Sequence, residues 1–216
     1  MKQRVAGLYA VTPDIDDTPQ LLGKVEAALA GGARLLQYRN KTASPALRLV
    51  QGRALLALCW EYQVPLIIND HLDLALALDA HVHVGGEDAS PSEARKRLGP
   101  DKIVGVSCYG HVENATAAAA AGATYVAFGG FFPSQVKPAS ARTPVTLLRE
   151  ARRAVKLPIV AIGGITIENA PQLIEAGADS IAVISALFGA ADVRAAAQGF
   201  GALFPRRRGD VAMEQR

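Results

Sequence analysis

Basic side chains alternate at the end of one short apolar run. Gln37-Tyr38-Arg39-Asn40-Lys41 follows Leu35-Leu36, and an extended strand would place Gln37, Arg39 and Lys41 on the same side. Arginine offers a planar set of donors and lysine a compact charge, a combination suited to a polyphosphate. The alternative interpretation is a solvated strand end with two surface cations.

Carboxylates follow the next two apolar runs. One run ends at Asn69-Asp70, and the other ends at Gly85-Gly86-Glu87-Asp88. Glycine lets the backbone approach a ligand closely. Mg²⁺ takes one or two carboxylates while phosphate oxygens and water complete its octahedron. We therefore predict Asp70 and Asp88 as Mg²⁺ ligands; the alternative is a helix-capping Asp88 and a turn at Asp70.

A second phosphate site is predicted further along the chain. Gly163-Gly164 follows an apolar run, and Ser185 follows the next one. Backbone amides after the last two strands of a barrel commonly bind phosphate, although two glycines also suit a tight turn. Ser107 lies at the end of another apolar run, where its hydroxyl could donate a hydrogen bond to a phosphate or to a heterocycle. Lys137 lies in the longest irregular connection, residues 129–143, which suits a lid over a phosphate site.

Two other chemistries are not expected. His71, His81 and His83 match no structural zinc spacing, and we interpret His81 and His83 as strand-start and packing residues. Cys108 has no evident base partner, so nucleophilic catalysis is not predicted.

Short apolar runs alternate with Ala-rich stretches of helical spacing along the whole chain. The eight predicted strands cover residues 7–12, 34–40, 65–70, 81–85, 102–109, 124–131, 158–165 and 180–188. Hydroxyl residues before proline predict helix N-termini at Thr18, Ser44, Ser90 and Thr143. Glycines in Gly31-Gly32, Gly122 and Gly177 predict left-handed helix ends.

Eight such units fit either an open doubly wound sheet or a closed barrel. Polar residues cluster at the carboxyl ends of nearly all the strands, and in a barrel those ends meet at one face. An open sheet would carry a glycine fingerprint after its first strand, whereas this chain has Val11-Thr12-Pro13. We therefore predict a single-domain α/β fold, a closed (β/α)8 TIM barrel over residues 1–204.

The composition fits one globular domain. The chain has 216 residues, is 50% hydrophobic and contains 2 cysteines, so it can bury a core without disulfides. The net charge of +3 comes partly from Arg206, Arg207 and Arg208, in a basic tail over 205–216 that we predict to be flexible. With no long apolar stretch and no signal peptide, we expect a cytoplasmic protein without membrane or nucleic-acid partners. A homo-oligomer through outer helices is compatible with the sequence.

The two predicted phosphate sites differ in kind. A cationic, carboxylate-bearing region suits a metal-bound diphosphate, and an amide pocket suits a monophosphate ester. Two phosphorylated substrates in one barrel indicate a transferase from which diphosphate leaves.

These motifs, in this order, resemble the thiamine phosphate synthase family from about Leu8 to Leu187. The family joins hydroxymethylpyrimidine diphosphate to hydroxyethylthiazole phosphate with Mg²⁺, giving thiamine phosphate and diphosphate. Its reaction is dissociative: diphosphate departs first, and the thiazole nitrogen captures the pyrimidine methylene cation. A transferase of this kind needs no general base on its nucleophile.

The resemblance implies roles for individual residues. Asp70 and Asp88 would hold Mg²⁺, Arg39, Lys41, Asn69 and Lys137 would grip the diphosphate, and Gln37 and Ser107 would contact the pyrimidine. The thiazole phosphate would bind to Ser134, Gln135, Val136, Gly164, Ile184 and Ser185, and Tyr38 and Asn40 belong to the substrate-binding segment 37–41. Arg39, Lys41, Ser107 and Lys137 would be catalytic.

The chain departs from the family in its lid. The family usually has a second threonine where this chain has Val136, so we expect weaker thiazole phosphate binding, and Gly86 stands where many members have glutamine. The alternatives are a thiazole tautomerase-like paralogue, which would not need the metal-diphosphate region, and a non-catalytic thiamine-phosphate-binding barrel.

Overall fold

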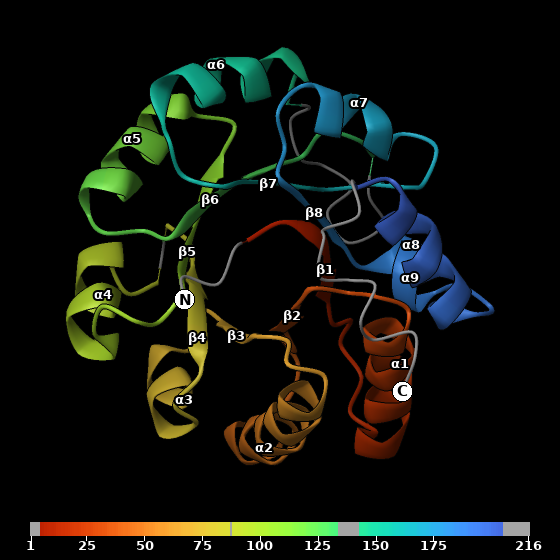
Figure 1. The fold of residues 1–216 in the computed structure, drawn as a ribbon. Coiled ribbons are helices and arrows are strands. Elements are labelled where there is room, and N and C mark those ends of the chain that lie inside the picture. The colour runs from red at the N-terminus through yellow and green to blue at the C-terminus, as the bar shows by residue number, and fades with distance from the viewer. Residues whose placement is uncertain (1–4, 87, 134–142, 205–216) are drawn as a thin grey trace.

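Eight parallel strands close into a barrel that is surrounded by helices (Figure 1). The computed structural model describes residues 5–86, 88–133 and 143–204. The strands are β1 (Gly7–Val11), β2 (Leu35–Tyr38), β3 (Leu66–Asn69), β4 (His81–Val84), β5 (Val104–Tyr109), β6 (Tyr125–Gly129), β7 (Ile159–Ile162) and β8 (Ser180–Val183). Each strand pairs in parallel with its sequence neighbours, and β8 pairs with β1 through Leu8 and Ile181. The predicted (β/α)8 barrel is confirmed.

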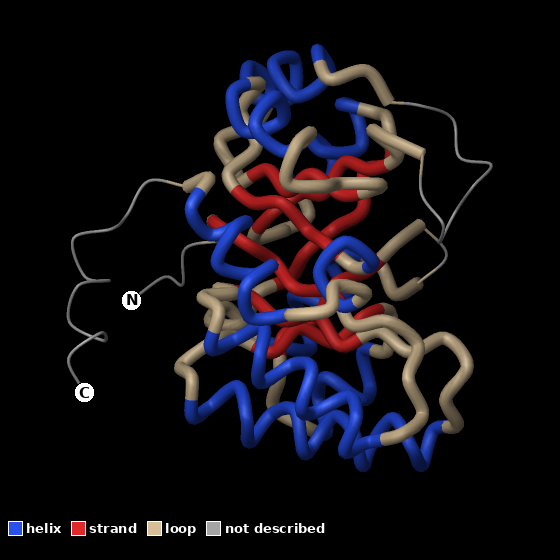
Figure 2. The backbone as a smooth tube through the Cα atoms, turned by 90° about the vertical axis from the view of Figure 1, so that its right-hand side faces the viewer, coloured by secondary structure: helices blue, strands red, loops and turns tan. Residues whose placement is uncertain are grey.

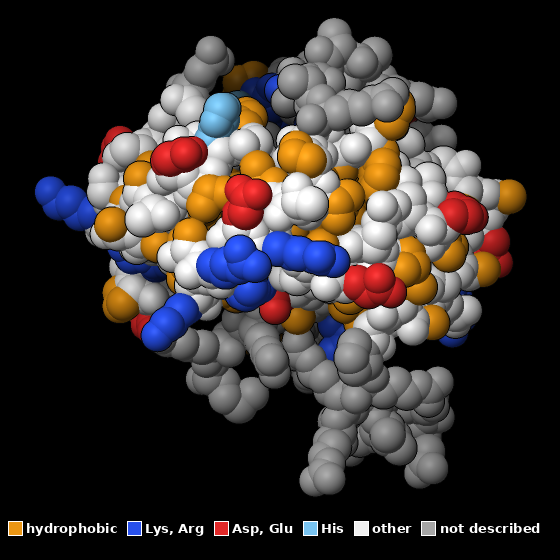
Figure 3. Space-filling view, turned by 90° about the horizontal axis from the view of Figure 1, so that it is seen from above, with side chains coloured by type: hydrophobic (Ala, Val, Ile, Leu, Met, Phe, Trp, Pro, Cys, Tyr) orange, Lys and Arg blue, Asp and Glu red, His pale blue; other side chains and the backbone are white. Residues whose placement is uncertain are grey.

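A helix follows each strand and packs on the outside, as the side view also shows (Figure 2). The helices are α1 (Thr18–Ala30), α2 (Pro45–Glu61), α3 (Leu72–Ala77), α4 (Pro91–Leu98), α5 (Val112–Ala120), α6 (Thr146–Ala154), α7 (Ala170–Glu175), α8 (Ser185–Phe188) and α9 (Val193–Ala202). On the outer face over α6 and α7, acidic and basic side chains lie among apolar ones (Figure 3). Within the described ranges, no helix has the length and apolar character needed to cross a membrane.

Strand alternation divides the core into two parts. Side chains such as Leu8, Leu36 and Ile68 pack outward against the helices. Tyr9 and Tyr125 belong to the second cluster, which fills the barrel interior. Both tyrosines are fully buried, so the interior contains hydroxyl groups that need partners.

The predicted helix starts are partly confirmed. Ser44 and Ser90 cap α2 and α4 by accepting hydrogen bonds from the amides of Leu47 and Glu93. The prediction for Thr18 is wrong by one residue, because the carboxylate of Asp17 is the cap of α1.

The prediction for Thr143 is wrong. Helix α6 begins at Thr146, and the Thr143 hydroxyl instead donates to the Gly129 carbonyl at 2.6 Å. Thr143 therefore ties the far end of the β6–α6 connection back to β6.

The predicted strand over 180–188 is wrong beyond Val183. The amides of Leu187 and Phe188 both donate to the Ile184 carbonyl, which turns the chain into the four-residue helix α8. Lys24 of α1 donates to the carbonyl of Phe188 at the other end of this helix. The apolar sequence of 180–188 hid this change, because buried strands and buried helices look alike over a few residues.

Candidate functional site

A cavity of about 690 Å³ opens at the carboxyl ends of the strands. It is lined by eight of the residues predicted from the sequence: Gln37, Arg39, Lys41, Asn69, Asp70, Asp88, Ser107 and Ile184. Strands β2 to β5 and β8 supply these side chains at their ends or just beyond, as expected for a barrel site.

The two predicted metal ligands lie together in this cavity. The pKa of Asp70 is raised to about 6 by burial and by hydrogen bonding and repulsion with Asp88, while Lys41 and Asn69 act in the opposite direction. One oxygen of Asp88 accepts a hydrogen bond from the Gly85 amide at 2.7 Å, which fixes its orientation. A carboxylate whose proton affinity is raised by a neighbouring carboxylate belongs to a site that a divalent cation would stabilise.

Asp70 itself has a left-handed backbone, with φ of 64°. Aspartate and asparagine adopt this conformation more readily than most residues. The amide of Asp70 donates to the His83 carbonyl of β4 at 2.8 Å, and the amide of Leu72 donates back to the Asp70 carbonyl. The turn after β3 is thereby held against β4, beside Asp88.

The cation Arg39 is held by a carboxylate that the sequence analysis missed. Its Nη1 atom lies 3.0 and 3.2 Å from the two oxygens of Asp14, in the β1–α1 loop. The backbone amide of Lys41 donates to the same carboxylate at 2.8 Å. Asp14 could not be recognised in the sequence because it lies 25 residues before Arg39.

The structure does not bring Tyr38 and Asn40 into the cavity. The Tyr38 ring packs between the barrel and the helices, and its hydroxyl donates to Oε1 of the buried Gln51 at 2.8 Å. The Asn40 oxygen accepts from the amides of Thr42 and Ala43. Strand alternation explains the result, since residues 38 and 40 point away from the side that carries Gln37, Arg39 and Lys41.

A chain of hydrogen bonds crosses the floor of the cavity. Gln37 Nε2 donates to the Tyr9 hydroxyl at 2.9 Å, which contacts the Tyr125 hydroxyl at 2.9 Å. Tyr125 contacts His83 Nδ1 at 2.8 Å, and His83 Nε2 contacts Ser107 Oγ at 2.8 Å. Gln37 and Ser107, the two residues assigned to one substrate ring, are thus the two ends of one network.

His83 is neutral within this network. Burial lowers its pKa to about 4, so the ring uses one nitrogen as a donor and the other as an acceptor. The expectation that His83 fills a packing layer is confirmed, but its place in the cavity wall was missed. Gly105 makes room for its partner Tyr125, because a Cβ at Gly105 would lie 2.1 Å from the tyrosine ring.

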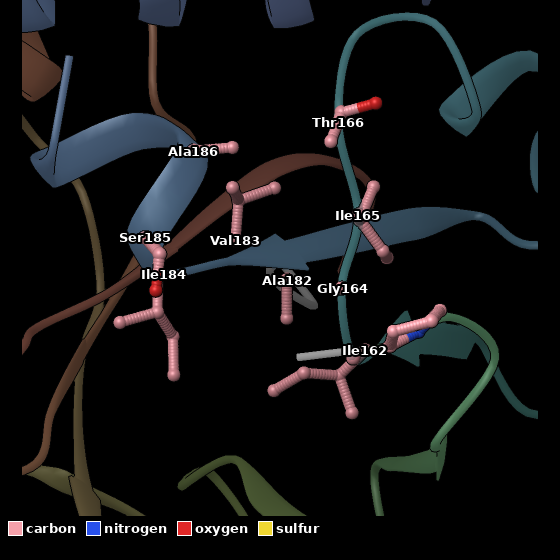
Figure 4. A pocket seen from close by; sticks show the side chains of 11 residues that line it. Ile162, Gly164, Ile165, Thr166, Ala182, Val183, Ile184, Ser185 and Ala186 are labelled. Atoms are coloured by element: carbon pink, nitrogen blue, oxygen red, sulfur yellow. The ribbon is translucent and has the colours of Figure 1, made fainter. Parts of the chain in front are cut away.

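A smaller pocket of about 160 Å³ lies between the turn after β7 and the start of α8 (Figure 4). Gly164 and Ser185, both predicted from the sequence, line it together with Thr166. The amides of Leu187 and Phe188 donate to the Ile184 carbonyl, whereas the first two amides of α8, those of Ser185 and Ala186, have no acceptor within the helix and are placed to bind an anion. Gly164 has φ of 64°, and a Cβ there would lie 2.3 Å from the Pro133 carbonyl oxygen, so only glycine fits.

Glu87 and the lid residues Ser134, Gln135, Val136 and Lys137 lie outside the described residues, as does the tail over 205–216. The described part of the chain contains no group of three or more potential metal-ligating His, Cys, Asp or Glu side chains. Burial raises the pKa of Cys59 and Cys108 to about 12, so neither thiol is activated as a nucleophile.

Comparison with known proteins agrees with this geometry. The family model for thiamine monophosphate synthase matches residues 8–187. The chain is 52% identical to the thiamine-phosphate synthase of Janthinobacterium sp. (strain Marseille), with 95% of this chain and 100% of the relative covered. It is 54% identical to that of Azoarcus sp. (strain BH72), with 94% and 100% covered.

A solved structure shares the same fold at moderate identity. The thiamine phosphate pyrophosphorylase from Pyrococcus furiosus superposes with a TM-score of 0.82 at 35% identity, covering 94% of this chain and 95% of that one. A 3-hexulose-6-phosphate synthase, at 20% identity and a TM-score of 0.67, shares the barrel fold alone. The family match and the relatives, each covering most of this chain, show that the chain belongs to the thiamine monophosphate synthase family.

Proposed function

We propose that the chain joins hydroxymethylpyrimidine diphosphate to hydroxyethylthiazole phosphate, releasing diphosphate and thiamine phosphate. One observation carries the proposal: the carboxylate-lined cavity and the smaller amide pocket adjoin each other. They share the lining residues Ile162, Gly163, Ala182 and Ile184. Two phosphorylated molecules can therefore meet above the barrel floor.

The diphosphate would lie against Arg39, Lys41 and Asn69, at the mouth of the larger cavity. Asp70 and Asp88 suit Mg²⁺, since their mutual repulsion is relieved by a divalent cation and two carboxylates leave room for phosphate oxygens and water. When bound there, Mg²⁺ would help to neutralise the charge of the leaving diphosphate. Lys137 is proposed for the same group from the sequence alone.

The pyrimidine ring would lie over the hydrogen-bonded floor, between Gln37 and Ser107. Because both side chains are anchored to the buried Tyr9–Tyr125–His83 chain, they would hold the ring without reorganising. The thiazole phosphate would enter the smaller pocket, where Gly164 and Ser185 lie on opposite sides.

This arrangement needs no proton abstraction from the nucleophile. The thiazole nitrogen carries no proton, so catalysis rests on stabilising the leaving group and on positioning the two rings. The inert thiols and the neutral His83 fit a site without an activated nucleophile. A cytoplasmic location and a homo-oligomer stay predictions.

The proposal is tested by diphosphate release from the purified full chain with both substrates and Mg²⁺. Release that requires both substrates is expected, and Asp70→Ala should reduce it at least a hundredfold. Asp101→Ala, which removes an exposed carboxylate elsewhere, is the matched control and should leave the rate unchanged. No release from the wild type, with thiamine phosphate still bound, would refute the proposal and favour a non-catalytic binder.

A further inference from the structure

Asp14 makes contacts that no substrate role explains. It lies in the loop between β1 and α1, and strands β1 and β2 are neighbours in the barrel (Figure 1). Its carboxylate accepts from Arg39 Nη1 and from the backbone amide of Lys41. A single carboxylate thus contacts both cationic residues of β2's end.

The loop that carries Asp14 is itself anchored from behind. Gln51 of α2 is fully buried, and its Nε2 donates to the carbonyls of Ile15 and Asp16 at 2.9 and 3.2 Å. Asn40 Nδ2 also donates to the Ile15 carbonyl at 3.2 Å. Gln51 in turn accepts from the Tyr38 hydroxyl. The two residues of segment 37–41 that point away from the cavity therefore help to fix the loop.

The strand end is also fixed on its outer side. Arg48 of α2 donates to the carbonyls of Asn40 and Lys41 at 3.1 and 3.3 Å. The backbone amide of Arg39 donates to Thr12 Oγ1 at 2.8 Å, and that hydroxyl donates to the Arg39 carbonyl. The backbone around Arg39 is thus held independently of Asp14, whereas among the described residues Asp14 is the only partner of its guanidinium group.

The ion pair between Asp14 and Arg39 is partly buried, which strengthens its hold on the guanidinium group. The Arg39 side chain is 13% exposed and that of Asp14 is 33% exposed, so the ion pair is partly shielded from water. A long arginine side chain has many rotamers, and a partner that holds it beforehand reduces the entropy lost when it binds an anion. The guanidinium group retains further N–H donors for a second anion in the cavity that it lines.

We propose that Asp14 is a positioning residue that holds Arg39, and through the Lys41 amide the start of the next turn, in the orientation that binds diphosphate. Asp14 itself does not touch the substrate. This inference rests on the proposed function, because it assigns Asp14 to the diphosphate end of that site. It predicts a defect confined to diphosphate-bearing molecules.

The test compares Asp14→Ala with Asp16→Ala in the full chain. Asp16 lies two residues away in the same loop and carries the same charge, but it has no contact with Arg39. Its Oδ1 accepts only a long bond of 3.4 Å from Asn40 Nδ2, which keeps its bond to the Ile15 carbonyl when Asp16 is replaced. Steady-state assays should show the KM for the pyrimidine diphosphate raised about tenfold by Asp14→Ala, with the KM for the thiazole phosphate unchanged. Calorimetric titration with Mg²⁺-diphosphate should show a similar weakening. Asp16→Ala should match the wild type in both, and thermal melts establish that each variant is folded.

A double-mutant comparison tests whether Asp14 acts through Arg39. In an Arg39→Ala background, Asp14→Ala should change diphosphate affinity less than threefold, because the side chain that it positions is gone. If the fold-changes in diphosphate affinity caused by Asp14→Ala and by Arg39→Ala simply multiply in the double variant, the two residues act independently and the proposal is overturned. So would unchanged or tighter diphosphate binding by Asp14→Ala, since that would make Asp14 a bystander or a competitor of the anion. If wild type and Asp16→Ala release no diphosphate, the proposed function fails instead, and the calorimetric arm still tests Asp14.

Discussion

The raised proton affinity of Asp70 predicts that the candidate site destabilises the free protein at neutral pH. The folded-state pKa of Asp70 is about 6, above its ordinary value of 3.8. Between these two values the folded state keeps a proton that the unfolded state has lost, so stability falls as the pH rises through this window. Above about pH 6 the full penalty is present, and below about pH 4 it is absent.

The variant Asp70→Asn should remove this penalty. A shift from 3.8 to about 6 corresponds to about 3 kcal/mol at 1.36 kcal/mol per pKa unit, and we discount it to about 1.5 kcal/mol because the carboxyl is partly exposed. For a chain of this size that is a Tm higher by about 3–6 °C. Asparagine also tolerates the left-handed backbone at this position, so the substitution adds little strain.

The assay is thermal unfolding in a chelating buffer from pH 4 to pH 8, with Asp101→Asn as the control. The control replaces an exposed carboxylate and should follow the wild type at every pH. The advantage of Asp70→Asn should appear between pH 4 and 6 and then stay constant. An advantage of equal size at pH 4 and pH 8, or none at pH 8, would refute the reasoning.

Three further predictions concern packing and hydrogen bonding. Gly164→Ala should raise the KM for the thiazole phosphate at least tenfold, because its Cβ would lie 2.3 Å from the Pro133 carbonyl oxygen and must displace the pocket wall; an unchanged KM would contradict the assigned site. Tyr125→Phe should lower the free energy of unfolding by about 1–3 kcal/mol, measured by urea denaturation, because it removes the hydrogen-bond partner of the Tyr9 hydroxyl hydrogen and of His83 Nδ1 in the buried interior. Gly23→Ala, in the middle of α1 with no atom within 4 Å of the new Cβ, should instead stabilise the protein by about 0.5–1 kcal/mol; a loss of stability would show that α1 is packed differently.

Much of the fold was predictable because each strand and each helix start is marked by residues that are close together in the sequence. The caps at Ser44 and Ser90 and the alternation around Gln37 depend on neighbours a few residues apart. Alternation also gave the correct side for Arg39 and Lys41. It equally implied that Tyr38 faces away, although the family resemblance had grouped it with the substrate-binding segment.

The errors arise where contacts are distant in sequence. Asp14 meets Arg39 across 25 residues, and Tyr9 meets Tyr125 across 116, so no local pattern marks either pair. The short helix α8 escaped prediction because its residues are apolar and its start depends on the conformation of Ile184. Contacts between residues this far apart in the sequence are determined by how the strands are arranged around the closed barrel, which only the structure shows.

The hydrogen bonds across the cavity floor all run in one direction from donor to acceptor, starting at Gln37 and ending at Ser107. The Gln37 amide nitrogen can only donate, so the Tyr9 hydroxyl oxygen accepts from it. The Tyr9 hydroxyl hydrogen must then be donated in a hydrogen bond to the Tyr125 oxygen. Tyr125 then donates to His83 Nδ1, and the hydrogen on Nε2 points to Ser107. The reverse order would leave the Tyr9 hydrogen buried without an acceptor.

This direction fixes what the floor offers to a ligand. The Ser107 oxygen accepts from His83, so its hydrogen is free to be donated into the cavity, whereas Gln37 Oε1 accepts from no described residue. A heterocycle is therefore matched only if it presents an acceptor to Ser107 and a donor to Gln37. A heterocycle that presents a carbonyl oxygen to Gln37 Oε1 would set two acceptors against each other and would bind more weakly, because of the orientation of a few buried hydrogens.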